Sequence, residues 1–213
     1  MPDTACWMNK AALYELLASA FCYPSEEVAS ALASGEFAEA FQEIGAANGV
    51  DERHLEERAE ALRAYVGRGA DAVLHALRRE HTRLFIGHGS TLISPYAGVW
   101  DSVAKGKKPM LMVGAESMAI ERFMRRCGVG QPEGTNEPLD HAATLLEFMY
   151  YLCLVKADAV KPSAHADVRD GDYRAFFDEH LAKFAAPFAD EVMRQTTEPF
   201  FASSAWLLRE LVA

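Results

Sequence analysis

Residues 136–153 show the strongest helical pattern in the chain and read NEPLDHAATLLEFMYYLC. Apolar side chains recur at intervals of three and four residues along this stretch, which is the spacing of an α-helix with one buried side. Asn136 is a favourable N-cap, and proline is well tolerated in a first helical turn. We therefore expect a long helix that begins at Glu137-Pro138. Its predicted apolar side comprises Leu139, Ala142, Ala143, Leu146, Met149, Tyr150 and Cys153.

The same spacing predicts helices on both sides of this stretch. Pro24 and Gly128 are suited to end two of them, and Asp51 is suited to cap a third. A polar, proline-containing loop is expected between Gly87 and Gly106. No alternating strand pattern and no internal repeat is evident. The fold class is therefore predicted to be all-α, a single-domain helical bundle over residues 1–213. The other expected helices cover approximately residues 13–21, 37–44, 52–66, 70–85, 115–127, 173–184, 188–196 and 200–212.

The composition is that of a globular protein with an acidic surface. The chain has 213 residues, of which 50% are hydrophobic and 24% are charged, and a domain usually contains about 100–200 residues. Its 21 Lys and Arg residues against 31 Asp and Glu residues give a net charge of −10. This charge disfavours a nucleic-acid interface and a polybasic membrane anchor, and it fits either a basic peptide partner or simple solubility.

Cysteine usage and hydropathy predict a cytoplasmic protein without a metal site. Cys6, Cys22, Cys127 and Cys153 form no CxxC pair, so the thiols are expected to be mostly buried and reduced. The N-terminus lacks the positive region of a secretory signal. The longest strongly apolar run, Phe148–Val155, is far shorter than the about 20 residues that a membrane span needs. The histidines form no HExxH motif and no pair at i, i+4.

The segment Glu137-Pro138-Leu139-Asp140-His141 is the sharpest local candidate for a functional site. On the expected helix, Glu137 shares a face with both Asp140 and His141, and these side chains lie at the helix start rather than on its apolar side. The pattern fits a capped helix start with a local Glu–His contact, or general acid–base chemistry. Adjacent residues on a helix diverge by about 100°, so Asp140 and His141 are poorly placed to act on one atom. No nucleophile or oxyanion motif accompanies them.

A second stretch joins the end of a helix to an aromatic loop. Residues 80–87 read EHTRLFIG, and residues 95–100 read PYAGVW. One interpretation is ordinary hydrophobic core, and the other is an apolar groove that accepts an incoming helix or extended peptide. The isolated glycine pairs at residues 87–89 and 128–130 lack the following lysine of a phosphate-binding loop, so no nucleotide site is predicted.

Together these two stretches resemble the TorD/DmsD family of redox-enzyme maturation chaperones, in an order and spacing closest to DmsD. The resemblance rests on RLFIG at residues 83–87, on Pro95 followed by GVW at residues 98–100, and on the EPxDH signature at residues 137–141. This signature is about the most specific motif of the family, and here it is intact. Weaker likeness extends over most of the chain, at residues 17–23, 118–128, 180–181, 187–188 and 198–200.

The resemblance implies an all-helical, non-catalytic, cytoplasmic protein that needs no cofactor of its own. Such proteins bind the twin-arginine (Tat) leader of a molybdopterin oxidoreductase of the dimethyl-sulfoxide-reductase type, and they hold the precursor until it is loaded and exported. Components of the Tat translocase are implied as further partners, whereas nucleic acid and stable membrane insertion are not. The residues that the resemblance implies for leader binding are Leu84, Phe85, Pro95, Tyr96, Trp100, Gly114, Glu137, Pro138, Asp140 and His141.

Charge and apolar burial would share the work of such a site. Carboxylates such as Glu137 and Asp140 can hold guanidinium groups through charge-assisted hydrogen bonds. Burial of about 300 Å² of apolar leader surface would contribute about 7 kcal/mol, and ordering the leader offsets much of it, which predicts micromolar affinity. Three alternatives stay open: a NarJ-like assembly factor for an enzyme subunit that is not exported, a small hydrolase that uses His141 with a carboxylate, and an acidic helical interaction module.

Overall fold

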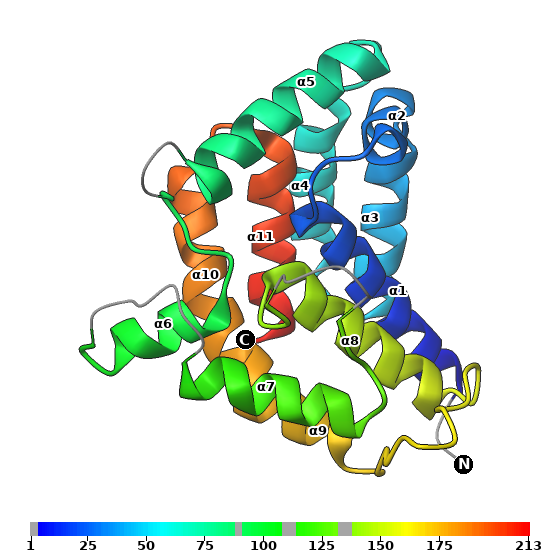
Figure 1. Cartoon of the computed structure of the whole chain (residues 1–213). Helices are drawn as coiled ribbons and strands as arrows, with labels where there is room; N and C mark the ends of the chain where they lie inside the picture. Colours follow the sequence, from blue (N-terminus) through cyan, green and yellow to red (C-terminus); the bar gives the residue numbers. More distant parts are fainter. Residues whose placement is uncertain (1–3, 88–90, 108–113, 132–137) are drawn as a thin grey trace. The chain divides into compact units, whose positions relative to one another are not determined.

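The computed structural model describes residues 4–87, 91–107, 114–131 and 138–213, and within these ranges the chain folds into helices joined by turns and short loops (Figure 1). In the described ranges, backbone pairing of the β type is limited to one isolated antiparallel bridge, between Tyr96 and His141. The all-α prediction is thus confirmed. The α-helices are α1 (Thr4–Phe21), α2 (Glu26–Ser34), α3 (Glu36–Ala47), α4 (Glu52–Arg63), α5 (Ala70–His81), α6 (Ala97–Ala104), α7 (Ala115–Arg126), α8 (Ala142–Lys156), α9 (Asp172–Phe176), α10 (Ala182–Gln195) and α11 (Pro199–Leu211). Two π-helical turns are η1 (Thr82–Ile86) and η2 (Phe177–Leu181).

Residue contacts divide the chain into two compact units. Unit 1 consists of residues 1–15 and 94–185, and unit 2 consists of residues 16–93 and 186–213. The boundaries fall within α1, between residues 93 and 94, and within α10. Each unit therefore joins segments that are far apart in the sequence, so that its core is assembled from long-range contacts.

Unit 2 is a bundle whose helices pack in pairs. Helix α3 packs against α4, α2 packs against both α5 and α3, and α11 packs against α4. Aromatic rings meet edge to face in its core, with a centroid distance of 5.2 Å between Phe21 and Phe188. Such contacts stabilise a core beyond the burial of apolar area alone. The largest fully buried side chains of this unit include Phe21, Phe41, Tyr65, Phe188, Phe200 and Phe201.

Two predicted helix boundaries, the start of α4 and the end of α7, are confirmed. The Asp51 carboxylate accepts a hydrogen bond from the His54 N–H at 3.1 Å and caps α4. Gly128 has a φ of +80° just after α7, a conformation that favours glycine. Helix α2 was not predicted, because Ala29 and Leu32 are its buried side chains and two positions do not make a recognisable apolar stripe.

Helix α5 and the turn η1 together cover the helix expected over residues 70–85. At η1 the backbone hydrogen bonds span five residues instead of four. The Gly87 N–H donates to the carbonyl of Thr82, five residues earlier, at 2.8 Å. Gly87 then ends the helical segment with a φ of +64°. The apolar spacing does not distinguish such a π-turn from an α-turn, so the sequence does not predict the π-helical turn.

A buried carboxylate joins the end of α5 to the connection between α10 and α11. Glu80 is only 5% exposed. It accepts two hydrogen bonds of 2.7 Å from the Arg83 guanidinium, one of 2.9 Å from the Thr196 hydroxyl and one of 2.8 Å from the Thr197 N–H. Burial raises the pKa of Glu80, but the bonds from Arg83, Thr197 and Thr196 outweigh it and bring the pKa to about 2. The carboxylate is therefore ionised at neutral pH.

Unit 1 contains the long apolar helix α8, which packs against α9 and η2, and it also contains α6, which packs against α7. Phe148 of α8 meets Phe176 of α9 edge to face at 4.6 Å. Arg126, at the end of α7, donates to both carboxylate oxygens of Asp172 at 2.9 and 2.8 Å. This bidentate pair joins the end of α7 to the start of α9, the geometry in which an Arg–carboxylate bond is strongest.

The C-terminal half departs from prediction at Pro187. A break was expected between residues 184 and 188, but α10 runs through Pro187 without interruption. Proline removes one backbone hydrogen bond from a helix interior. Here Phe184, Ala185, Phe188 and Ala189 are all buried on either side of it, so packing of the apolar face outweighs the lost bond.

The cysteines and the hydropathy of the helices add two further observations. All four cysteines are free: Cys127 and Cys153 are buried, Cys22 is half-buried and Cys6 is exposed. Burial raises the pKa of the Cys153 thiol to about 12, so this thiol is protonated at neutral pH. Among the described helices, none combines the length with the apolar character that crossing a bilayer would require.

Candidate functional site

A short backbone bridge in unit 1 brings four of the predicted site residues together. The Ala97 N–H donates to the carbonyl of Asp140 at 2.9 Å, and the Ala142 N–H donates to the carbonyl of Pro95 at 2.8 Å. These two bonds pair Tyr96 with His141 in antiparallel orientation. Pro95, Tyr96, Asp140 and His141 therefore lie in one cluster, although more than forty positions separate the two segments in the sequence.

The bridge shows that the predicted start of α8 is wrong. The helix was expected to begin at Glu137-Pro138, but α8 begins at Ala142. His141 has extended backbone angles, φ −68° and ψ 141°, because its segment pairs with residues 95–97 instead of coiling. Asp140 and His141 thus precede the helix, and the shared helical face predicted for them with Glu137 is not formed. Glu137 itself lies outside the described residues.

Asp140 is a buried hydrogen-bond acceptor and not an exposed charge. Asp140 is only 2% exposed. Oδ2 accepts one hydrogen bond from the Gly98 N–H at 2.9 Å and another from the Ser117 hydroxyl at 2.7 Å. Gly98 lies in the first turn of α6 and Ser117 in the first turn of α7. The carboxylate therefore holds the starts of both helices, where a negative charge is favoured by the helix dipole.

This cap from a distant residue explains why α6 exists where a loop was predicted. Residues 97–104 carry no capping side chain of their own at Tyr96, and the first turn receives its acceptor from Asp140, 42 residues later. Local sequence does not show such a partner. The approach is also close: a Cβ at Gly98 would lie 2.3 Å from Ser117 Oγ and 3.0 Å from Asp140 Oδ2. A side chain at position 98 would therefore displace Ser117 from its hydrogen bond with Asp140, which favours glycine.

His141 caps α8 through its ring. Nδ1 accepts a hydrogen bond from the Ala143 N–H at 3.2 Å, which assigns the ring proton of the neutral form to Nε2. The ring also meets Tyr96 edge to face, with centroids 5.4 Å apart. Asp140 and His141 thus bind different backbone N–H groups, at residues 98 and 143. This arrangement is that of two caps and not of an acid–base dyad.

Helix α6 presents an apolar stripe beside this cluster. Val99, Trp100 and Val103 are spaced so that they share one side of the helix, and Val103 is 56% exposed. Trp100 is half-buried. Its Nε1–H donates to the carbonyl of Ser94 at 2.8 Å, and the centroids of the Trp100 and Phe184 rings are 6.5 Å apart. On the neighbouring helix α7, Met118 is 43% exposed. We call Val99, Trp100, Val103 and Met118 the α6–α7 apolar surface.

The remaining predicted residues divide between the two units. Gly114 is half-buried immediately before α7, and Pro138 is exposed immediately before the bridge. Leu84 and Phe85 belong to unit 2, where they are core residues. The Leu84 carbonyl accepts the Ile93 N–H at 2.9 Å, and Phe85 stacks on Phe188 at 5.9 Å. Of the two interpretations of residues 84 and 85, the structure favours ordinary core.

Five residues of the cluster and of the α6–α7 apolar surface are not among the predicted site residues. They are Gly98, Val99, Val103, Ser117 and Met118. Nothing in the sequence around Ser117 indicates its bond to Asp140. The spacing of Val99 and Val103 could have indicated a helix with an apolar side, but the nearby proline and glycines outweighed it.

Comparison with known proteins identifies relatives over most of the chain. A family model described as the nitrate reductase delta subunit matches residues 49–190, which is more than half of the chain. The chaperone protein TorD of Shewanella pealeana is 23% identical over 201 residues, covering 93% of this chain and 84% of TorD. A crystal structure described as a redox enzyme maturation protein of Archaeoglobus fulgidus shares the fold, with a TM-score of 0.53, 22% identity, and coverage of 95% of this chain and 93% of that one.

Proposed function

The chain belongs to the nitrate reductase delta subunit family, and from that premise we propose that it binds the twin-arginine leader of a molybdopterin oxidoreductase in the cytoplasm. It is a redox-enzyme maturation chaperone of the TorD type, not an enzyme. The leader, the dimethyl-sulfoxide-reductase class of the client and its export by the Tat translocase are the proposed part. The observation that carries the proposal is the α6–α7 apolar surface beside the bridged EPxDH segment.

The α6–α7 apolar surface suits the apolar part of a leader. A twin-arginine leader continues from its arginines into an apolar, helix-prone segment, and such segments bind by laying one face on an apolar surface. Val103 and Met118 are large apolar side chains that are about half exposed, and Trp100 supplies an aromatic ring on α6. Burial of one such side chain contributes about 1.5–3 kcal/mol.

Hydrogen bonds of Asp140 and Trp100 keep the α6–α7 apolar surface in a fixed conformation. Asp140 holds the starts of α6 and α7 together, and the Trp100 N–H is bonded to the backbone of Ser94. A surface that is ordered before binding loses less conformational entropy when the leader arrives. Asp140, Gly98 and Ser117 are therefore positioning residues, and Pro138, Tyr96, Trp100 and His141 remain the proposed contacts.

Charge is assigned the smaller share of the binding. The net charge of −10 attracts a basic leader over a distance of about 8–10 Å at physiological salt. Asp140 is buried and bonded within the chain, so it does not offer its carboxylate to the arginines. Glu137 stays the proposed carboxylate partner for a guanidinium group. An exposed ion pair of this kind is worth only about 0–1 kcal/mol.

We expect calorimetric titration to show saturable 1:1 binding of the twin-arginine leader of the client molybdoenzyme. Changing both arginines of the leader to lysine should weaken binding only a few-fold. Two Asp substitutions in the apolar segment of the leader should weaken it at least about a hundredfold, because each carboxylate must lose its water on binding or keep that part of the leader off the surface. The apolar component should persist at high salt and show a negative heat-capacity change. The reverse order of losses would show that charge recognition governs binding.

A second candidate is favoured by the description of the matching family. A nitrate reductase delta subunit model matches residues 49–190, and a NarJ-like assembly factor would bind an enzyme subunit that is not exported. The same titration separates the two candidates. Binding to the N-terminal segment of a non-exported subunit, with no binding to any twin-arginine leader, would select the assembly factor.

A further inference from the structure

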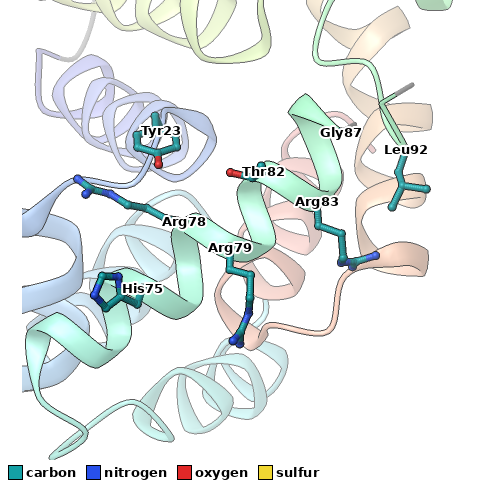
Figure 2. A pocket seen from close by; sticks show the side chains of 8 residues that line it. All are labelled: Tyr23, His75, Arg78, Arg79, Thr82, Arg83, Gly87 and Leu92. Carbon is teal, nitrogen blue, oxygen red and sulfur yellow. The ribbon is translucent and has the colours of Figure 1, made fainter. Parts of the chain in front are cut away.

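A basic pocket in unit 2 is lined by residues other than those assigned to the leader. It has a volume of about 700 Å³, and its side chains are arranged along one side of α5 and η1 (Figure 2). Tyr23 enters it from the turn after α1, and Leu92 enters it from the segment after η1. The residues that line it are Tyr23, His75, Arg78, Arg79, Thr82, Arg83, Gly87 and Leu92.

The charge of this pocket is opposite to that of the chain. The chain has a net charge of −10, yet three arginines and one histidine line the pocket, and none of its lining residues is acidic. His75, Arg79 and Thr82 are spaced as neighbours on one helical face. A basic leader would be repelled here, because its guanidinium groups would face those of the pocket. The charge of the pocket therefore favours an anionic ligand.

The three arginines of the pocket differ in the hydrogen bonds and ion pairs that they make within the chain. Arg83 is paired with the buried Glu80. Arg78 donates to the carbonyl of Pro24 at 3.0 Å, and its guanidinium lies 5.2 Å from the centre of the Tyr23 ring. Arg79 is exposed on α5 and carries no hydrogen bond or ion pair within the described ranges. Its guanidinium can therefore bind a carboxylate without breaking an existing contact.

Two apolar groups in the same pocket restrict the kind of anion. Tyr23 is 54% exposed and Leu92 is 49% exposed. A small inorganic ion would leave both uncovered, whereas an acidic peptide with an apolar side chain would cover them and pair with the arginines. We propose that this pocket binds an acidic segment of a partner polypeptide, with carboxylates on Arg79 and beside Arg78 and with separate apolar side chains against Tyr23 and Leu92. This site is independent of the leader site.

The proposal is tested with a fluorescein-labelled peptide that repeats Glu-Glu-Leu and a matched peptide that repeats Gln-Gln-Leu. Fluorescence anisotropy should show binding of the acidic peptide alone, and the binding should weaken at least about tenfold as salt rises from about 50 to 500 mM. Arg79→Glu should weaken it about tenfold or more, because it removes one ion pair and adds a like charge. Arg122→Glu is the matched control, since Arg122 is exposed on α7 outside the pocket.

Three results would overturn the proposal. Equal losses in Arg79→Glu and Arg122→Glu would show a general effect of net charge. Equal binding of both peptides would show apolar adsorption. Inorganic tripolyphosphate and unlabelled acidic peptide can each be used to displace the labelled peptide. If tripolyphosphate displaces it at a far lower concentration than the unlabelled peptide does, the pocket is assigned to phosphate ligands. Arg79→Glu should keep its leader binding and its melting temperature, so that failure here is distinguishable from failure of the leader proposal.

Discussion

Replacement of Asp140 by alanine is expected to lower the free energy of unfolding by about 2–4 kcal/mol and to weaken leader binding at least about tenfold. The carboxylate is buried and accepts two hydrogen bonds, from the Gly98 N–H and the Ser117 hydroxyl. Its removal leaves the buried Gly98 N–H and the half-buried Ser117 hydroxyl without this acceptor and releases the starts of α6 and α7. Urea denaturation gives the change in stability, and calorimetric titration gives the change in affinity.

Two further variants separate positioning from direct contact. Asp140→Asn keeps one acceptor oxygen, so it should recover part of both losses. Asp101→Ala is the control, since Asp101 lies on α6 in an exposed ion pair with Lys105 and should change stability by only about 0–1 kcal/mol. Loss of leader binding in Asp140→Ala with unchanged stability would contradict the capping role and make Asp140 a direct ligand of the leader.

Replacement of Glu80 by alanine is expected to cost about 3–4 kcal/mol of stability at neutral pH, because it leaves Arg83 without its partner and Thr197 without an acceptor. The pKa of Glu80 is about 2 in the folded chain and about 4.3 in an unfolded one. A lowered folded pKa means that this stability is fully present above about pH 4.3 and is lost as pH falls towards about 2. Urea denaturation between these pH values measures the loss.

Glu80→Gln provides the pH-independent comparison. Its stability should change less with pH than that of the unchanged chain over the same window, because position 80 no longer takes up a proton. Glu57→Gln is the control for the charge change, since Glu57 is exposed and pairs with Arg53 at 3.6 Å. Parallel pH profiles for Glu80→Gln and the unchanged chain would mean that other carboxylates govern acid unfolding.

Sequence reasoning succeeded where a helix is specified by its own residues. Helix α4 carries its cap at Asp51 and its apolar stripe within one segment, and α7 ends at Arg126, shortly before Gly128, as expected. It failed where a partner distant in sequence determines the local conformation. Helix α6 depends on Asp140, and the delayed start of α8 depends on pairing with residues 95–97.

The candidate site divides in the same way. The bridge joins Pro95 and Tyr96 to Asp140 and His141, as the two separate motifs had suggested for one site. The roles of these residues could not be predicted, because burial of Asp140 and capping by His141 arise only when the segments meet. The network around Glu80 was also invisible, since Thr196 and Thr197 lie more than a hundred residues from it.

Photo-cross-linking of the client leader tests the proposed leader site most directly. A benzophenone side chain placed in the apolar segment of the leader should attach to residues 96–103 and to residues 138–141, as mapped by mass spectrometry of the digested complex. The twin arginines changed to lysine should leave this pattern in place. Attachment confined to the acidic pocket between α3 and α4, lined by Glu39, Glu43, Glu52 and Glu56, would contradict the assignment of leader binding to the α6–α7 apolar surface.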